Sequence, residues 1–186
     1  MHLFFNLLLA HLFADFPLQT DALARYKSKH LMGVVLHVMI YIVVTSLMIS
    51  DVKRYWPLLA SLGIAHFLID VAKPYLCKHL AENRAFVLDQ CLHMVTMLGA
   101  ATMAHWWWDP APRGAVPDAW LPYALLAASL PAFIVAYWIW AHSNGHEYLK
   151  RYQWQQQFYR RALMIEQRFG LIVIALTIWV LVRSGT

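Results

Sequence analysis

The sequence predicts an all-α protein, a polytopic membrane helix bundle with about six transmembrane helices. Of its 186 residues, 61% are hydrophobic and only 13% are charged. A soluble domain is nearer half apolar and a quarter charged, so this composition indicates a lipid environment. Several apolar runs approach the roughly 20 residues that a helix needs to cross a bilayer. The alternating pattern of a membrane β-barrel strand does not occur.

Four helices are expected in the first part of the chain, where residues 1–105 would form a membrane core. Their predicted bounds are His2–Phe16, Leu31–Ile49, Pro57–Leu76 and Phe86–His105. The first is short for a span, so we expect it to tilt little or to thin the bilayer locally. Arg25, Lys27 and Lys29 indicate a basic loop after it. Pro74 is expected to kink or end the third helix, because proline lacks a backbone donor.

The second part of the chain is expected to add two membrane helices. Residues 106–120 begin with three tryptophans and continue as a Pro-rich stretch, which predicts an extracytoplasmic loop behind an interfacial anchor. Within residues 121–186, membrane helices are predicted at Leu121–His142 and Phe169–Val182. The segment Gly145–Arg168 between them is polar, basic and aromatic, which predicts an amphipathic helix on the cytoplasmic surface.

The basic residues favour one side of this bundle. The formal net charge is +5, and most of the 15 lysines and arginines fall in the first, third and fifth loops. The positive-inside rule therefore places these loops in the cytoplasm and both termini outside it. This pattern explains the charge of the protein without a nucleic-acid partner.

Seven ionisable residues interrupt the apolar segments, where such groups are costly and are usually functional. They are His11, Asp15, His37, His66, Asp70, Asp89 and His93. Six of them form pairs at a spacing of four residues, so the members of each pair share one helix face. Given the expected helix directions, all seven lie in the cytoplasmic half of the bilayer. We therefore expect them to meet in one polar site.

Imidazole and carboxylate groups together are the ligands of zinc, iron and manganese, and pairs at helical spacing build metal sites in bundles. The seven residues are therefore the predicted ligands of a divalent metal ion, with one or two metals left open. Asp15, Asp70 and Asp89 are also predicted to act in catalysis as acid–base groups. Lys73, about 20° from His66 on the helical wheel, is predicted to orient an anionic group of the substrate.

A short internal repeat accompanies these residues. The segment HLFADF at 11–16 is similar to HFLIDV at 66–71, and each is followed by another histidine at a similar distance, His37 and His93. Two hairpins of the same orientation would give a parallel repeat, in which equivalent residues converge on a pseudo-twofold axis. The matching segment is short, so coincidence is the alternative.

In these residues the chain resembles a bacterial family of small integral membrane proteins known only as a domain of unknown function. The family pattern is H-x-x-A-D-F-x-L-Q, then a lysine and a histidine, then H-x-x-x-D-x-x-K and D-Q-x-x-H. The first half of the chain matches it with His11, Asp15, Phe16, Gln19, Lys29, His37, His66, Asp70, Lys73, Asp89, Gln90 and His93. More distantly, the chain is similar to inner-membrane proteins regarded as metal-dependent hydrolases. The resemblance implies a multi-pass protein of the bacterial inner membrane.

The function expected first is a metal-dependent membrane hydrolase. It would act from the cytoplasmic side on a phosphoester or lipid-linked substrate, with membrane lipid around it. One alternative is a transporter that passes protons or metal ions along the intramembrane histidines and aspartates. Others are haem ligation by two buried histidines and a non-catalytic membrane subunit whose polar residues only join helices. The substrate, the metal and the oligomeric state are left open by the sequence.

Overall fold

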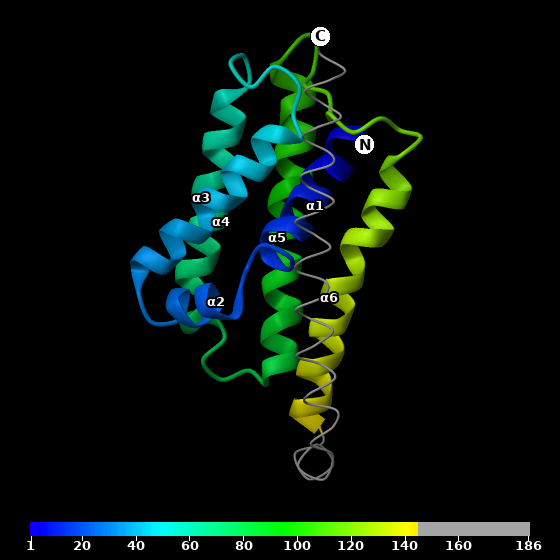
Figure 1. The fold of residues 1–186 in the computed structure, drawn as a ribbon. Coiled ribbons are helices and arrows are strands. Elements are labelled where there is room, and N and C mark those ends of the chain that lie inside the picture. Colours follow the sequence, from blue (N-terminus) through cyan, green and yellow to red (C-terminus); the bar gives the residue numbers. More distant parts are fainter. Residues whose placement is uncertain (145–186) are drawn as a thin grey trace.

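The computed structural model describes residues 1–144, and within this range every regular element is a helix (Figure 1). The predicted amphipathic helix Gly145–Arg168 and the last predicted membrane helix Phe169–Val182 lie outside the described residues. The helices are α1 (His2–Asp15), α2 (Asp21–Lys27), α3 (Leu31–Leu47), α4 (Trp56–Leu76), α5 (Glu82–Trp107) and α6 (Leu121–Asn144). The predicted all-α class is confirmed.

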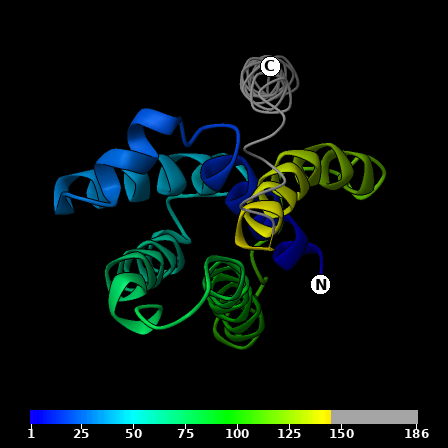
Figure 2. The same cartoon turned by 90° about the horizontal axis from the view of Figure 1, so that it is seen from below.

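Helices α1, α3, α4 and α5 form a ring in which each helix packs against the next, and α5 closes the ring against α1. Helix α6 packs outside this ring against α1 and α5, as the view along the bundle shows (Figure 2). Figure 1 shows that α1 and α4 descend while α3 and α5 rise. The two hairpins α1–α3 and α4–α5 thus have the same orientation, which is the arrangement that the short sequence repeat predicts.

Within residues 1–144, three helices are long and apolar enough to cross a membrane: Trp56–Leu76, Glu82–Trp107 and Leu121–Trp140. In their most apolar windows only 33%, 17% and 11% of the residues are buried inside the structure. A water-soluble bundle would bury such faces, so the outward apolar surface fits lipid better than water. The apolar helices α1 and α3, with 14 and 17 residues, are shorter.

The two ends of the ring differ in chemistry. Around the start of α1 and the end of α5 the core is apolar, with a cluster that includes Leu3, Leu7, Leu58, Leu59, Leu62, Met97 and Ala104. The end of α1 and the start of α5 instead surround buried histidines and aspartates. In the described residues, the buried polar groups therefore lie near one end of the bundle and the core toward the other end is apolar.

The connection from α5 to α6 is attached to the apolar end by hydrogen bonds. The backbone amide of Val116 donates to the buried Asn6 Oδ1 at 3.0 Å, and Gly114 forms an isolated β-bridge with Ile49. A side chain at Gly114 would overlap the Asn6 amide, so only glycine permits this approach. Asn6 is fully buried, and both of its polar atoms have partners: Oδ1 accepts from the loop, and Nδ2 donates to the His2 carbonyl oxygen within α1.

The structure corrects the prediction of a basic loop at Arg25–Lys29. Residues Asp21–Lys27 form helix α2. Thr20 caps its N-terminus, and the Thr20 hydroxyl accepts a hydrogen bond from the Leu23 amide at 3.3 Å. A capping threonine followed by an acidic first turn and a basic last turn suits a helix. The short length of the segment concealed this signal. Pro74 lies within the last turn of α4, which continues to Leu76.

Candidate functional site

The structure brings the seven predicted site residues together at one end of the four-helix ring. His11 and Asp15 come from α1, and His37 comes from α3. The second hairpin contributes His66 and Asp70 from α4 and Asp89 and His93 from α5. Each is buried, with at most 8% of its surface exposed. Their proximity is thus a fact of the fold, whereas their roles as metal ligands and catalytic groups remain predictions.

Three of these residues, Asp15, His37 and His66, present ligand atoms at spacings that suit a metal ion. The Nε2 atoms of His37 and His66 are 3.0 Å apart, and Asp15 Oδ1 lies 3.3 Å and 3.7 Å from them. Ligand atoms bound about 2.0–2.1 Å from a tetrahedral zinc ion are about 3.3–3.4 Å apart. The three atoms therefore fit one face of a tetrahedral site.

Asp70 borders this face and has a cationic partner. Its Oδ2 lies 3.7 Å from His37 Nε2 and 3.6 Å from His66 Nε2. The ammonium of Lys27 donates to both Asp70 oxygens, at 3.1 Å and 3.2 Å. Lys27 is the last residue of α2. The sequence analysis predicted neither this helix nor a role for Lys27 in the site. The sequence offered no clear signal, because nothing in the spacing distinguishes Lys27 from the neighbouring Arg25 and Lys29.

A second part of the cluster surrounds Asp89. Lys73 Nζ donates to Asp89 Oδ2 at 2.6 Å, and Asp89 Oδ1 lies 3.7 Å from His93 Nε2. Asp70, Asp89 and His93 together offer three ligand atoms within 4.8 Å of one another, as do His11, His66 and His93. Lys73 is the most exposed member, with 36% of its side chain accessible. It is therefore the member of the cluster that a substrate can reach most directly.

The orientation of His11 follows from its neighbours. Gln90 Nε2 donates to Asp89 Oδ2 at 3.4 Å, so the Gln90 Oε1 atom is left to accept from His11 Nε2 at 3.2 Å. In the neutral ring, His11 Nδ1 then carries a lone pair and faces Asp15 Oδ1 at 3.4 Å. Two acceptors in this position require a cation or a proton between them.

Several buried atoms of the cluster make no hydrogen bond within the part of the chain that the structure describes. They are His11 Nδ1, Asp15 Oδ1, His37 Nδ1, His66 Nδ1, Asp89 Oδ1 and His93 Nε2. Buried polar groups without partners are costly, and an ion held by Asp15, His37 and His66 would give Asp15 Oδ1 a partner. The unpartnered Nδ1 atoms of His37 and His66 are not the Nε2 atoms that face Asp15, so this ion would not account for them. Nitrogen and carboxylate donors of this kind suit zinc, iron or manganese. The residues present thus fit a divalent metal ion.

The charges of the cluster support the same conclusion. Of its three carboxylates, Asp70 pairs with Lys27 and Asp89 pairs with Lys73, whereas the ion-pair neighbours of Asp15 in the described residues are histidines. With neutral imidazoles one negative charge is left over in a buried site, where an uncompensated charge is expensive. A divalent cation would convert this excess into a net charge of about +1.

Tyr41 is a further residue of the site that the sequence interpretation did not single out. Its ring stacks on the His66 ring, with centroids 4.2 Å apart and planes inclined by 21°. The His93 ring lies on His66 as well, at 4.2 Å between centroids. His66 is thus held between two rings. Tyr41 follows His37 by four residues, so helical spacing could have identified it.

A cavity of about 250 Å³ gives access to the cluster. It lies where the end of α1, helix α2, the end of α4 and the start of α5 meet. Its polar lining residues are Asp15, Gln19, Asp21, Lys27, Lys73, Asp89 and Gln90. Acidic, basic and amide groups around a recess above buried imidazoles are the features of a binding or catalytic site. We call this recess the polar pocket.

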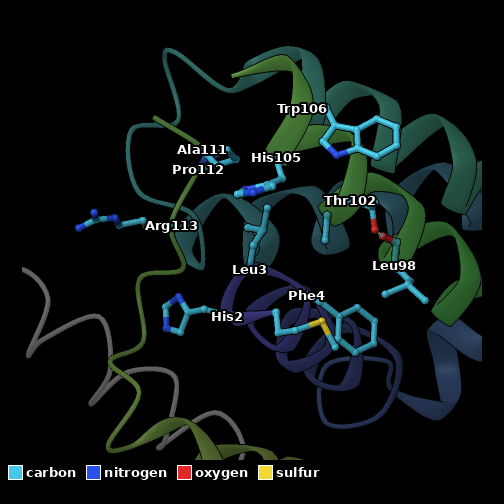
Figure 3. A pocket seen from close by; sticks show the side chains of 12 residues that line it. His2, Leu3, Phe4, Leu98, Thr102, His105, Trp106, Ala111, Pro112 and Arg113 are labelled. Atoms are coloured by element: carbon cyan, nitrogen blue, oxygen red, sulfur yellow. Dashed lines mark hydrogen bonds between the residues drawn. The ribbon is translucent and has the colours of Figure 1, made fainter. Parts of the chain in front are cut away.

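A larger cavity of about 330 Å³ lies at the opposite end of the bundle (Figure 3). It is bordered by the start of α1, the end of α5 and the following loop, with His2, His105, Trp106 and Arg113 among its lining residues. None of the seven clustered residues lines it. The larger cavity is thus separate from the buried histidines and aspartates.

The fold and the site define a class of protein: a helical bundle with membrane-length helices and a buried histidine–aspartate cluster that could hold a metal ion. The chain belongs to the family described as protein of unknown function (DUF3307), whose model matches residues 3–111. This range contains the whole cluster. No curated protein and no solved structure matches the chain.

Proposed function

We propose that the protein is a metal-dependent membrane hydrolase that acts on a phosphoester from the cytoplasmic side. The observation that supports this most is the buried group of Asp15, His37 and His66, whose three ligand atoms are spaced as a metal ion requires. The polar pocket beside it offers room for a substrate group. The metal proposed is zinc, iron or manganese.

The residues of the cluster would have different roles in metal binding, proton transfer and substrate binding. A bound metal ion would polarise the phosphoryl oxygen and lower the pKa of a coordinated water. Asp89, whose Oδ1 is without a hydrogen bond in the described part of the chain, would accept a proton from the attacking water. Lys73, partly exposed in the pocket wall, would hold the anionic group of the substrate. Asp70 would border the metal and stay paired with Lys27.

One metal ion suits the charges of the cluster better than two. A single divalent ion gives the cluster a net charge of about +1, which attracts a phosphoester anion. A second ion at Asp70, Asp89 and His93 would have to displace the lysine ammonium groups from both carboxylates. We therefore propose a mononuclear centre formed by Asp15, His37 and His66.

The proposed setting is the bacterial inner membrane, with several spans and with the polar pocket toward the cytoplasm. Arg25, Lys29, Lys78 and Arg84 belong to the loops and helix ends that would face the cytoplasm. The positive-inside rule places that end in the cytoplasm and the N-terminus outside. In this orientation a cytoplasmic substrate reaches the pocket without crossing the membrane.

A proton or metal-ion pathway is the second candidate, and the linked histidines and aspartates favour it. A pathway has to continue to the other face of the membrane. In the described residues the ring beyond the cluster is filled by apolar side chains such as Leu7, Leu62 and Met97. This apolar layer supports an enzyme with one entrance over a transport route. Ion flux in proteoliposomes would distinguish the two.

The first test measures metal in the purified full-length protein. We expect about one zinc, iron or manganese ion per chain, and we expect Asp15→Asn to weaken metal affinity by about 100-fold or more. His105→Ala is the matched control, because His105 is an exposed histidine of α5 at the opposite end of the bundle. A wild-type chain that binds none of these metals, or an Asp15→Asn chain with unchanged affinity, would contradict the proposal.

The second test measures hydrolysis of a water-soluble phosphoester by the metal-loaded protein. Asp89→Asn should lower kcat by roughly 10²- to 10⁴-fold, the usual contribution of a general base, while metal content stays the same. Lys73→Met should mainly raise KM, because it removes an anion-binding charge. The hydrolase proposal fails if wild-type protein with full metal content shows no activity on any phosphoester class tried.

A further inference from the structure

An apolar groove lies between the first turns of α5 and the C-terminal half of α6. Its volume is about 580 Å³, within the range of small-molecule sites. Its walls include Val87 and Cys91 from α5 and Ala136, Ile139 and Trp140 from α6. Val87 and Trp140 are exposed by 58% and 56%. In a membrane this groove would face the hydrocarbon of the lipid.

The groove adjoins the polar pocket. Phe86 and Ile139 line both the groove and the pocket, so one side of each residue faces an apolar space and the other a polar one. The Phe86 ring is in edge contact with the ring of Phe16, the residue that follows α1, with centroids 6.4 Å apart. Phe86 is therefore part of the partition between the two spaces.

Cationic groups line both the groove and the polar pocket. Arg84 lines the groove, and Lys73 and Lys27 line the pocket together with three carboxylates, from Asp15, Asp21 and Asp89. Lys27 is paired with Asp70, and Lys73, which is paired with Asp89, is the more exposed of the two lysines. An anionic headgroup attached to an acyl chain would find cations beside the pocket and an apolar channel beside the cations.

From this continuity we infer that the groove receives an acyl chain and that the substrate is an anionic lipid phosphoester entering from the membrane. The headgroup would lie in the polar pocket near Lys73, and the chain would pass Phe86 into the groove between α5 and α6. This inference rests on the proposed hydrolase function and narrows its substrate to a membrane lipid.

Photo-crosslinking in nanodiscs of phosphatidylcholine tests the inference on the full-length chain. The probes are phosphatidic acid with a diazirine in one acyl chain and diacylglycerol with the same chain. Crosslinked peptides are mapped by mass spectrometry. We expect the anionic probe to label residues 87–91 and 136–140 roughly tenfold more than the neutral probe, as a charge-assisted hydrogen bond to Lys73 would give.

Three variants sharpen the experiment. Ala136→Trp fills the groove and should abolish its labelling, whereas Val43→Trp, at an exposed apolar position of α3, should leave the labelling unchanged. Lys73→Met should reduce labelling by phosphatidic acid to the level of the neutral probe. Equal labelling by both probes would show ordinary contact with surrounding lipid and overturn the inference. Labelling that survives Ala136→Trp would overturn it as well.

The labelling requires no turnover, so its result is separate from that of the hydrolase tests. Loss of groove labelling with intact metal binding and intact hydrolysis of a soluble phosphoester would overturn only the lipid substrate. Headgroup-dependent groove labelling in a protein without hydrolytic activity would support the lipid site while the hydrolase proposal fails.

Discussion

Lys27 and Asp70 form a buried ion pair between two segments far apart in the sequence. Asp70 accepts two hydrogen bonds from the Lys27 ammonium, and its side chain is 1% exposed. A buried carboxylate that loses its cation remains as an uncompensated charge, which costs far more than the pair contributes. Lys27 therefore has a structural role beside any catalytic one.

Removing Lys27 alone should be more damaging than removing both partners. We expect Lys27→Met to lower the free energy of unfolding by about 3–5 kcal/mol, and we expect the double change with Asp70→Asn to cost less. Unfolding in detergent micelles, followed by circular dichroism, measures both. If the double variant is less stable than Lys27→Met alone, the lysine is not compensating the Asp70 charge.

Asp15, His37 and His66 are the residues whose spacing supports a metal ion, and the sequence identified all three. Polar groups in apolar helices are conspicuous, and a spacing of four residues places two of them on one face. The sequence could not show that Asp15 Oδ1 approaches imidazoles from three helices. That arrangement depends on how the helices pack.

At the scale of elements, α2 is held against α3 by a close approach of backbones. A Cβ at Gly33, in the first turn of α3, would meet backbone atoms of Lys27 and Tyr26 at 2.5–2.6 Å. Backbone cannot move aside as a flexible side chain does, so glycine is needed there. The position of α2 in turn determines whether Lys27 reaches Asp70.

Gly33→Ala should therefore displace α2 and weaken the Lys27–Asp70 pair. We expect a loss of about 1–3 kcal/mol in the free energy of unfolding, the usual cost of an overpacked contact. Gly99→Ala is the control, because a Cβ at Gly99 in α5 meets no atom within 4 Å. In a helix that change should stabilise by up to about 1 kcal/mol. Equal effects of the two substitutions would refute this account of α2.

Helix α2 also shows the limit of reading elements from a sequence. Its seven residues are too few for a clear periodic pattern, and its charges favour a loop by composition. The longer helices were predictable because their apolar runs exceed any loop length. The ends of these helices were harder to predict: α5 begins at Glu82, whereas the sequence analysis placed its first residue at Phe86.

At the scale of the whole molecule, apolar sides and charged ends give the bundle an orientation. The exposed faces of α4, α5 and α6 are largely apolar. The α3–α4 connection, with Lys53, and the α2–α3 connection, with Ser28, lie at opposite ends of the bundle (Figure 1). A protein that spans the inner membrane would expose these two connections on different sides.

Thiol labelling can check this orientation in a chain in which Cys77 and Cys91 are replaced by serine. We expect a membrane-impermeant maleimide to label Lys53→Cys in intact spheroplasts, and to label Ser28→Cys only after the membrane is opened. Both positions are exposed, so accessibility within the fold does not limit the reaction. Labelling of both in intact spheroplasts would contradict a span between them, and the reverse pattern would invert the orientation.

The sequence by itself determined the helical class, the apolar segments and the seven residues of the cluster, because hydrophobicity and a spacing of four residues are local properties. Only the tertiary structure decided the partners: Lys27 for Asp70, Lys73 for Asp89 and the Tyr41 ring for His66. Such partners come from different helices. Which of them meet is determined by the packing of four helices around one axis, and a spacing of residues within one helix does not specify the contacts between helices.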